Sequence, residues 1–394
     1  MKSIAQSVNS LTVRLSAMCT AVCVMAYYSS MPVILGRAAV ARNLSENDLG
    51  LLAGAFAGGV AITAIAAIFF IRHLSWKKTV VVGGLLAALA FSVPIFTESF
   101  QLTLVTHLIA GLACGLGYSV AIACLGDSDD PTRNYAFCFV LQTIVGMTIS
   151  HFLPRLTTAD NGFQAALLLL ASLSLFSVFF SIVLPTNNLK QNAQLAQSPR
   201  LGPSVYLMLS LAVIFLIYAG DGSVWAFVEM IALKKEFTPE SAGTAVGLSL
   251  LAGAFGSFMA GTLGTKYGYF KPMLVSVVVS IASVIMLELN HSITSFMIAI
   301  AINGWAWNFG SGYRMGLVAE LDTSGRFTPL ITGMQLLGTT AGTIIAGFLV
   351  TDSGFQWVYI FAAIAWTVSL LLFSAALRST KKTEKSDDLL LVRQ

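Results

Sequence analysis

The feature that most constrains this chain is a series of apolar stretches, each about 20 residues or longer, that follow one another along almost its whole length. An α-helix rises about 1.5 Å per residue, so about 20 apolar residues cross the hydrocarbon core of a bilayer. We count twelve such spans, at about 12–36, 46–71, 78–97, 101–125, 132–154, 162–184, 204–232, 239–265, 271–290, 293–318, 326–350 and 355–378. The sequence therefore predicts an all-α membrane protein with twelve transmembrane helices.

Composition excludes most other classes. Apolar residues make up 56% of the chain and charged residues 10%, against about 25% charged residues in soluble domains. We find no phosphate-binding loop, no catalytic triad and no metal-ligand spacing. We therefore expect no enzyme activity, no cofactor, no metal and no nucleic-acid partner; the expected surroundings are a lipid bilayer.

The loop charges predict the orientation. Of the 22 Lys and Arg residues, sixteen fall on the side that holds both termini and the even-numbered connections, and five fall on the other side. Positive charge is enriched in cytoplasmic loops. We therefore expect a multi-pass protein of the cytoplasmic (inner) membrane with both termini in the cytoplasm.

The two halves of the chain resemble each other at an offset of 193 residues. Asp129, Arg133 and Gln142 fall on Asp322, Arg326 and Gln335, and Tyr28 falls on Asp221. Six spans separate the copies, so both copies share one topology and are related by an axis along the membrane normal. We expect two pseudo-symmetric six-helix halves at 1–184 and 204–378, a cytoplasmic linker at 185–203, and a charged, flexible cytoplasmic tail at 379–394.

Small residues recur every four positions in the second, eighth and eleventh spans. Examples are Gly50 and Gly54, Gly253, and the pair Gly338 and Gly342. In lipid this spacing allows close helix packing. We expect these faces to form the interface between the halves.

Two acids lie within an apolar span. An Asp near the middle of a membrane helix costs roughly 2.5–3.5 kcal/mol on insertion scales. Asp221, Trp225 and Glu229 are spaced i, i+4, i+8, which predicts one stripe along a helix facing a translocation pathway. We expect Asp221 and Glu229 to exchange protons, although Glu229 could instead be an interfacial anchor.

In its twelve spans and its two six-helix halves, the chain resembles the major facilitator superfamily. Its loop motif, roughly G-x-L-A-D-R-x-G-R-R/K, appears as Gly261-Thr-Leu263-Gly-Thr265-Lys266-Tyr-Gly268-Tyr-Phe-Lys271, with Thr265 at the Asp position. The resemblance implies that helices one, four, seven and ten line a cavity. Carried onto this chain, the substrate-binding residues are Tyr27, Tyr28, His107, Tyr118, Asp221, Trp225, Trp305 and Asn308. The alternative for the aromatic residues is anchoring or packing.

Two charged loops and one Arg within an apolar span are further candidates for a functional role. Asp129 precedes Arg133, and Asp322 precedes Arg326, by four residues each. These pairs predict either a latch at a cytoplasmic gate or simple helix capping. Arg314, near the inner end of span ten, could reach the lipid headgroups or face the cavity.

These features predict a secondary active transporter of a small organic solute, working by alternating access. We expect a monomer with proton coupling, export as a candidate direction, and an amphiphilic solute of cationic character. An uncoupled facilitator and a non-transporting membrane sensor on the same scaffold stay open as alternatives.

Overall fold

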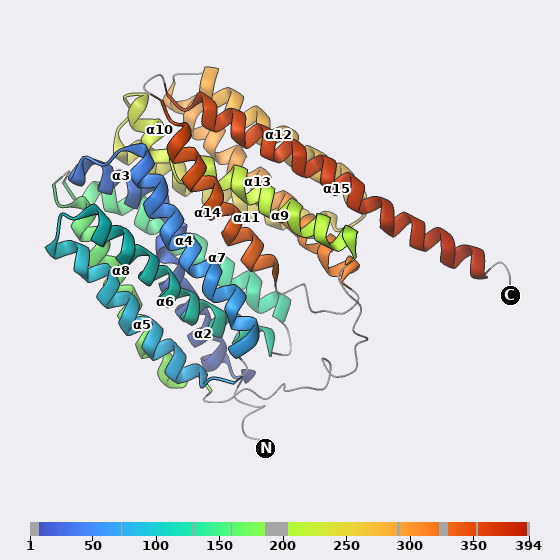
Figure 1. The fold of residues 1–394 in the computed structure, drawn as a ribbon, viewed down its shortest axis with the longest axis horizontal. Helices are drawn as coiled ribbons and strands as arrows, with labels where there is room; N and C mark the ends of the chain where they lie inside the picture. Colours follow the sequence, from blue (N-terminus) through green and yellow to red (C-terminus); the bar gives the residue numbers. More distant parts are fainter. Residues whose placement is uncertain are drawn as a thin grey trace.

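The computed structural model describes residues 8–71, 73–128, 131–158, 160–185, 204–289, 292–322, 330–351 and 354–391. Over these residues the chain forms helices and, apart from one isolated bridge, no β-structure (Figure 1). The elements in chain order are α2 Leu11–Ser29, α3 Met31–Arg42, α4 Glu46–Phe70, α5 Trp76–Ser92, η1 Val93–Phe96, α6 Phe100–Gly126, α7 Pro131–Leu156, α8 Gly162–Phe180, η2 Ser181–Val183, α9 Val205–Trp225, α10 Val228–Lys234, α11 Pro239–Leu263, α12 Phe270–Leu289, α13 Ile293–Leu321, α14 Leu330–Leu349 and α15 Gln356–Leu391.

The predicted membrane helices are present. Within the described residues, 11 helical segments are long and apolar enough to cross a membrane. The remaining crossing is α13, which has 29 residues and carries Asn303, Asn308 and Arg314 among its apolar residues. The prediction of an all-α protein with twelve membrane helices is confirmed.

The first helix of each half is interrupted. In the first half the break falls at Ser30, and Pro32 lies in the first turn of α3, where its missing N–H costs nothing. In the second half, α9 ends at Trp225 and α10 begins at Val228. The prediction of one continuous stripe through Asp221, Trp225 and Glu229 is therefore wrong, because Glu229 belongs to a separate short helix.

The last helix is longer than predicted. We expected a flexible tail after Arg378, but α15 continues to Leu391. In Figure 1, α15 extends well beyond the rest of the bundle toward the C-terminus.

α3 and α10 bring the two halves together at one end of the bundle, and α4 and α14 also contact each other toward the opposite end, where a Cβ at Gly333 would lie 2.5 Å from Ile65. We call the end with Arg42 and Lys234, the last residues of α3 and α10, the outer end. The end with Leu11 and Val205, the first residues of α2 and α9, is the inner end. In Figure 1, α3 and α10 lie at the end where they bring the halves together, and the helices diverge toward the ends that carry the termini.

Glycines set the closest helix contacts, but not all where we expected them. A Cβ at Gly50 would lie 2.5 Å from the backbone oxygen of Thr343 in α14, so α4 and α14 do join the halves. A Cβ at Gly342 would overlap the backbone oxygen of Ala219 in α9. The assignment of Gly338 and Gly342 to the interface between halves is wrong, because this face of α14 packs on α9 of the same half.

We predict that Gly342→Ala lowers the thermal stability of the purified protein. The new methyl group meets backbone, which cannot rotate away, and overpacking of this kind costs about 1–3 kcal/mol. Gly261→Ala is the matched control, because a Cβ there has no neighbour within 4 Å and Ala favours the helix by up to about 1 kcal/mol. Melting curves in detergent would contradict the packing argument if Gly342→Ala melted no lower than Gly261→Ala.

Candidate functional site

Asp221 lies deep in the bundle near the middle of the seventh crossing. Its side chain is buried, with 2% of its surface exposed. The indole Nε1 of Trp366 in α15 donates a hydrogen bond of 2.9 Å to Oδ1, while Oδ2 has no partner among the described residues. Gly220 permits this contact, because a Cβ there would lie 2.6 Å from Trp366 Nε1. The sequence thus places a half-satisfied carboxyl group between α9 and α15.

Tyr28 faces this acid from the other half of the protein. Its hydroxyl lies 3.3 Å from Thr339 Oγ1 of α14, and its backbone oxygen accepts a bond of 3.4 Å from Trp225 Nε1. Tyr28 also lies near Asp221. Tyr28 thus connects α2 to both α9 and α14, and its direct pairing with Asp221 stays a prediction.

Aromatic rings surround the same place. Trp307 in α13 contacts Tyr218 edge-on, with ring centroids 5.6 Å apart, and Trp225 at 6.1 Å. Gln335 in α14 donates a 2.8 Å bond to the Tyr218 hydroxyl. Tyr118 in α6 of the first half lies near Tyr218. Tyr218, Trp307 and Gln335 are half-buried, so part of each of these side chains stays accessible.

Arg314 does not extend toward the lipid headgroups. Its Nη2 donates to the backbone oxygen of Trp307 at 2.9 Å and to Ser311 Oγ at 2.7 Å, both closer to the middle of the membrane than its own Cα. The side chain is 2% exposed. Gly310 leaves space for the side chain, because a Cβ at this position would lie 2.6 Å from Nη1. Of the two alternatives for Arg314, reaching the lipid headgroups is wrong, because the side chain is buried within the bundle.

Glu229 lies elsewhere, at the outer end. Arg37 of α3 donates to Glu229 Oε1 of α10 from Nη2 at 2.6 Å and from Nε at 3.2 Å. The two side chains are 4% and 0% exposed. Gly36 makes room, because a Cβ there would overlap the Glu229 carboxyl group. The pair is a buried ionic link between the halves, apart from Asp221.

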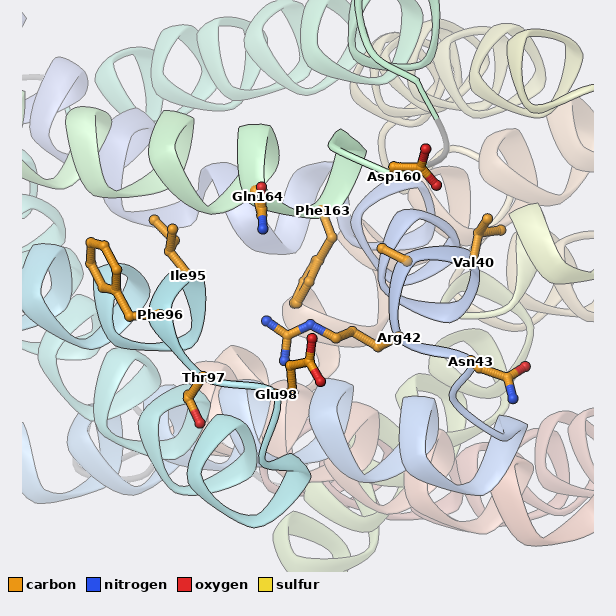
Figure 2. Close-up of a pocket in the computed structure, with 11 residues that line it drawn as sticks. Val40, Arg42, Asn43, Ile95, Phe96, Thr97, Glu98, Asp160, Phe163 and Gln164 are labelled. Atoms are coloured by element: carbon orange, nitrogen blue, oxygen red, sulfur yellow. The ribbon is translucent and has the colours of Figure 1, made fainter.

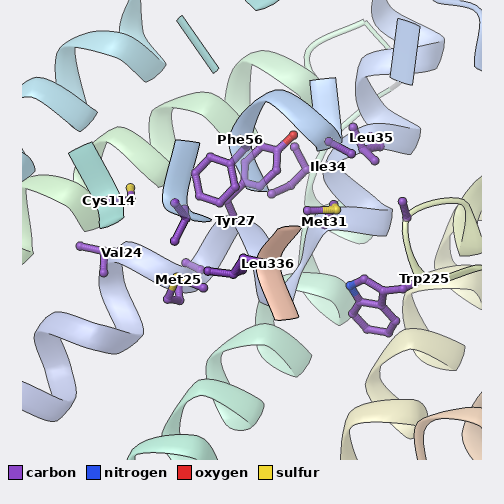
Figure 3. Packing of buried hydrophobic residues seen from close by; sticks show 14 of the residues in the cluster. Val24, Met25, Tyr27, Met31, Ile34, Leu35, Phe56, Cys114, Trp225 and Leu336 are labelled. Carbon is purple, nitrogen blue, oxygen red and sulfur yellow. The ribbon is translucent and has the colours of Figure 1, made fainter. Parts of the chain in front are cut away.

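Tyr27 and His107 belong to an aromatic cluster inside the first half. Tyr27 stacks on Phe56 with centroids 4.2 Å apart and meets His107 edge-on at 5.6 Å. Figure 3 shows Tyr27 and Phe56 ring against ring, well away from Trp225. His107 Nδ1 lies 2.8 Å from the backbone oxygen of Thr103. The structure does not bring these two residues to Asp221.

Trp305 and Asn308 point away from the cluster as well. Trp305 stacks on Phe309 with centroids 4.7 Å apart. Asn308 Nδ2 donates to the backbone oxygen of Gly304 at 3.0 Å and packs against Gly253 of α11. Of the predicted binding residues, Tyr28, Tyr118, Asp221 and Trp225 are therefore gathered and the other four are not.

The predicted cytoplasmic gate falls mostly outside the described residues. Asp129, Arg326 and the side chain of Arg133 are among those not described. Asp322 is buried at the C-cap of α13, where its N–H bonds to the backbone oxygen of Val318. The latch stays a prediction.

A separate hollow of about 650 Å³ opens at the outer end of the first half (Figure 2). Arg42, Glu98 and Asp160 line it, and the Arg42 guanidinium lies 5.5 Å from the Phe163 ring centroid. It is lined by α3, η1 and α8, and Asp221 is not part of it. Within the described residues, no group of three or more His, Cys, Asp or Glu side chains could hold a metal.

Sequence reasoning left five residues of the cluster out of the predicted site. Trp307 and Arg314, spaced i, i+7, share a helix face, and Tyr218 lies one turn before Asp221, so helical spacing was a usable signal. Gln335 was noticed only as a repeat match. Trp366 had no signal, because it comes from helix twelve, outside the helices that the resemblance indicated.

Comparison with known proteins supports this architecture. A family model described as Major Facilitator Superfamily matches residues 15–210 and 210–390. A curated relative, an uncharacterized MFS-type transporter YybF of Bacillus subtilis (strain 168), is 22% identical over 308 residues, which cover 74% of this chain and 75% of the relative.

Solved structures of similar fold include nucleoside transporter NupG and a D-xylose-proton symporter. NupG has a TM-score of 0.71 and 16% identity, covering 94% of this chain and 99% of NupG. The symporter has a TM-score of 0.72 and 12% identity, covering 92% and 96%. At these identities the likeness shows the fold alone.

Proposed function

Since this chain belongs to the major facilitator superfamily of membrane transporters, we propose that it moves a small organic solute by alternating access, with a proton exchanged at Asp221. The observation that carries the proposal is the Asp221 carboxyl group, which is buried at mid-membrane with one oxygen unpartnered among the described residues. Acids at such depth are costly and mark ion or proton pathways. Half-buried aromatic residues beside Asp221 supply surfaces for an organic solute.

The contacts between halves support one closed gate. The buried Arg37–Glu229 pair and the backbone contact at Gly50 close the outer end, and the Tyr28–Thr339 contact joins the halves at mid-depth. Alternating access requires these contacts to break when the outer end opens. Glu229 is therefore a gating residue in this proposal, and Asp221 alone exchanges the proton.

The proposal also includes the membrane, the orientation of the chain and the direction of transport. We place the protein in the cytoplasmic membrane as a monomer with both termini in the cytoplasm, because positive charge gathers on the inner side. A proton symporter on the same fold is a precedent for coupling. The direction of transport follows from whether proton and solute move together, and export stays the sequence-based prediction.

We predict that an imposed pH gradient drives solute movement in proteoliposomes. Ligands would first be found by thermal shift at about pH 5.5 and 7.5, since a solute that binds the folded state raises its melting temperature. The radiolabelled ligand would then be followed with and without the gradient. Transport that ignores the gradient would indicate a facilitator, and binding without transport would indicate a sensor; either result contradicts the proposal.

A further inference from the structure

The Tyr218 hydroxyl and Arg314 present hydrogen-bonding groups beside Asp221. The Tyr218 hydroxyl accepts a hydrogen bond of 2.8 Å from the Gln335 amide, and Arg314 lies near it. A hydroxyl oxygen has two lone pairs. Gln335 uses one of these lone pairs, and the Tyr218 O–H group can itself donate to a further acceptor.

Arg314 carries an N–H donor that lacks an acceptor among the described residues. A guanidinium carries five N–H groups, but the two acceptors recorded for it, the Trp307 oxygen and Ser311 Oγ, are both reached from Nη2. Its Nε has no acceptor among the described residues. Arg314 and Asp221 influence each other, yet they form no ion pair in the described part of the chain. A fixed positive charge is thus buried with N–H groups to spare.

We propose that the transported solute is an organic anion whose carboxylate binds Arg314 and the Tyr218 hydroxyl, with an apolar or aromatic body against Trp307 and Trp225. A guanidinium matches a carboxylate geometrically, and such bonds are among the strongest in proteins. This inference rests on the proposed function and changes the expected sign of the solute, because Asp221 alone had indicated a cation.

Charge balance then sets the coupling. The charged or titratable side chains that face Asp221 are Arg314 of α13, Tyr28 of α2 and Tyr218 of α9, and Trp366 of α15 donates to it. The empty site is neutral when Asp221 is ionised beside Arg314. It is neutral again when one carboxylate has bound and one proton from water has been added to Asp221 Oδ2. Charged sites are costly within a membrane protein. The protein can therefore switch readily between its outward-facing and inward-facing states in both of these neutral forms.

This balance predicts cotransport of one proton with one carboxylate. In a cell whose proton gradient is directed inward, cotransport drives uptake. The inference therefore predicts uptake in place of export.

Binding to detergent-purified protein tests the inference without transport. The probes are acid and amide pairs: benzoate with benzamide, phenylacetate with phenylacetamide, and indole-3-acetate with indole-3-acetamide, with benzylamine as the cation. At about pH 6 and above these acids stay ionised. We expect at least one acid to bind about 10- to 100-fold more tightly than its amide, and its affinity to rise by up to about tenfold per pH unit as pH falls.

Substitutions locate the anion. Arg314→Gln should abolish the preference for acid over amide, and Arg314→Lys, which keeps the charge without the planar fork, should retain part of it. Asp221→Asn should bind the acid with little dependence on pH. Because Arg314→Lys keeps the buried charge, it serves if Arg314→Gln does not fold.

Three results would overturn the inference: no carboxylate of the panel binds, the amides or benzylamine bind as well as the acids, or Arg314→Gln binds the acids unchanged. Gradient-driven transport of a neutral or cationic solute would also overturn it while leaving the proposed function intact. Carboxylate binding at Arg314 without transport would contradict the proposed function and leave the carboxylate site intact.

Discussion

Replacing Glu229 by alanine should lower the free energy of unfolding by about 3–5 kcal/mol, because it leaves the Arg37 guanidinium buried without its partner. Arg37 donates twice to Glu229 Oε1, and both side chains are almost fully buried. An exposed ion pair would be worth about 0–1 kcal/mol, so burial is what makes the expected loss large. The measurement is thermal or denaturant unfolding in detergent.

The double variant Arg37→Leu/Glu229→Ala is the control. If the loss comes from the stranded charge, removing both partners should recover much of it, because an apolar replacement of a buried pair is often neutral. The same variants should label more readily at a cysteine introduced at the outer end, since the link between α3 and α10 is gone. A double variant as unstable as Glu229→Ala would show that packing at Gly36, and not the charge, holds this end together.

The sequence predicted the membrane helices well because apolar length is a local property. Each span was visible in its own 20 or so residues, and the helices differ from the prediction mainly at ends and breaks. The break at Ser30 had a local signal in Pro32. The break after Trp225 had none as clear, so Glu229 was placed on the wrong face.

The site was predicted less completely because it depends on which helices touch. The internal repeat carries three-dimensional information, and it directed attention to Tyr28, which contacts Trp225 and Thr339 of the other half. Trp366 reaches Asp221 from helix twelve, and no spacing within one helix could reveal that contact. No local pattern indicated the burial of Arg37 against Glu229, because it is a contact between residues 192 apart in sequence.

Replacing Asp221 by asparagine should reduce proton-driven accumulation of the solute to the level of liposomes without protein. Asparagine keeps the size of the side chain and an oxygen that accepts from Trp366 Nε1, but it has no proton to exchange. Exchange of labelled for unlabelled solute in the absence of a gradient should continue. The measurement is uptake into proteoliposomes with and without an imposed pH gradient.

The contrast between these two assays follows from the charge on the site. In the Asp221→Asn variant the new amide is neutral. The loaded site holds Arg314 and a carboxylate, so it is also neutral, and the loaded protein can still switch between its two states. The empty site holds Arg314 alone and is positive. The empty protein therefore switches back slowly to the state that takes up solute, and net accumulation stops. Trp366→Phe is the control, since it removes the hydrogen bond and keeps the carboxyl group, and it should shift the pH profile without uncoupling transport. Accumulation by Asp221→Asn at the wild-type level would place the proton on another residue.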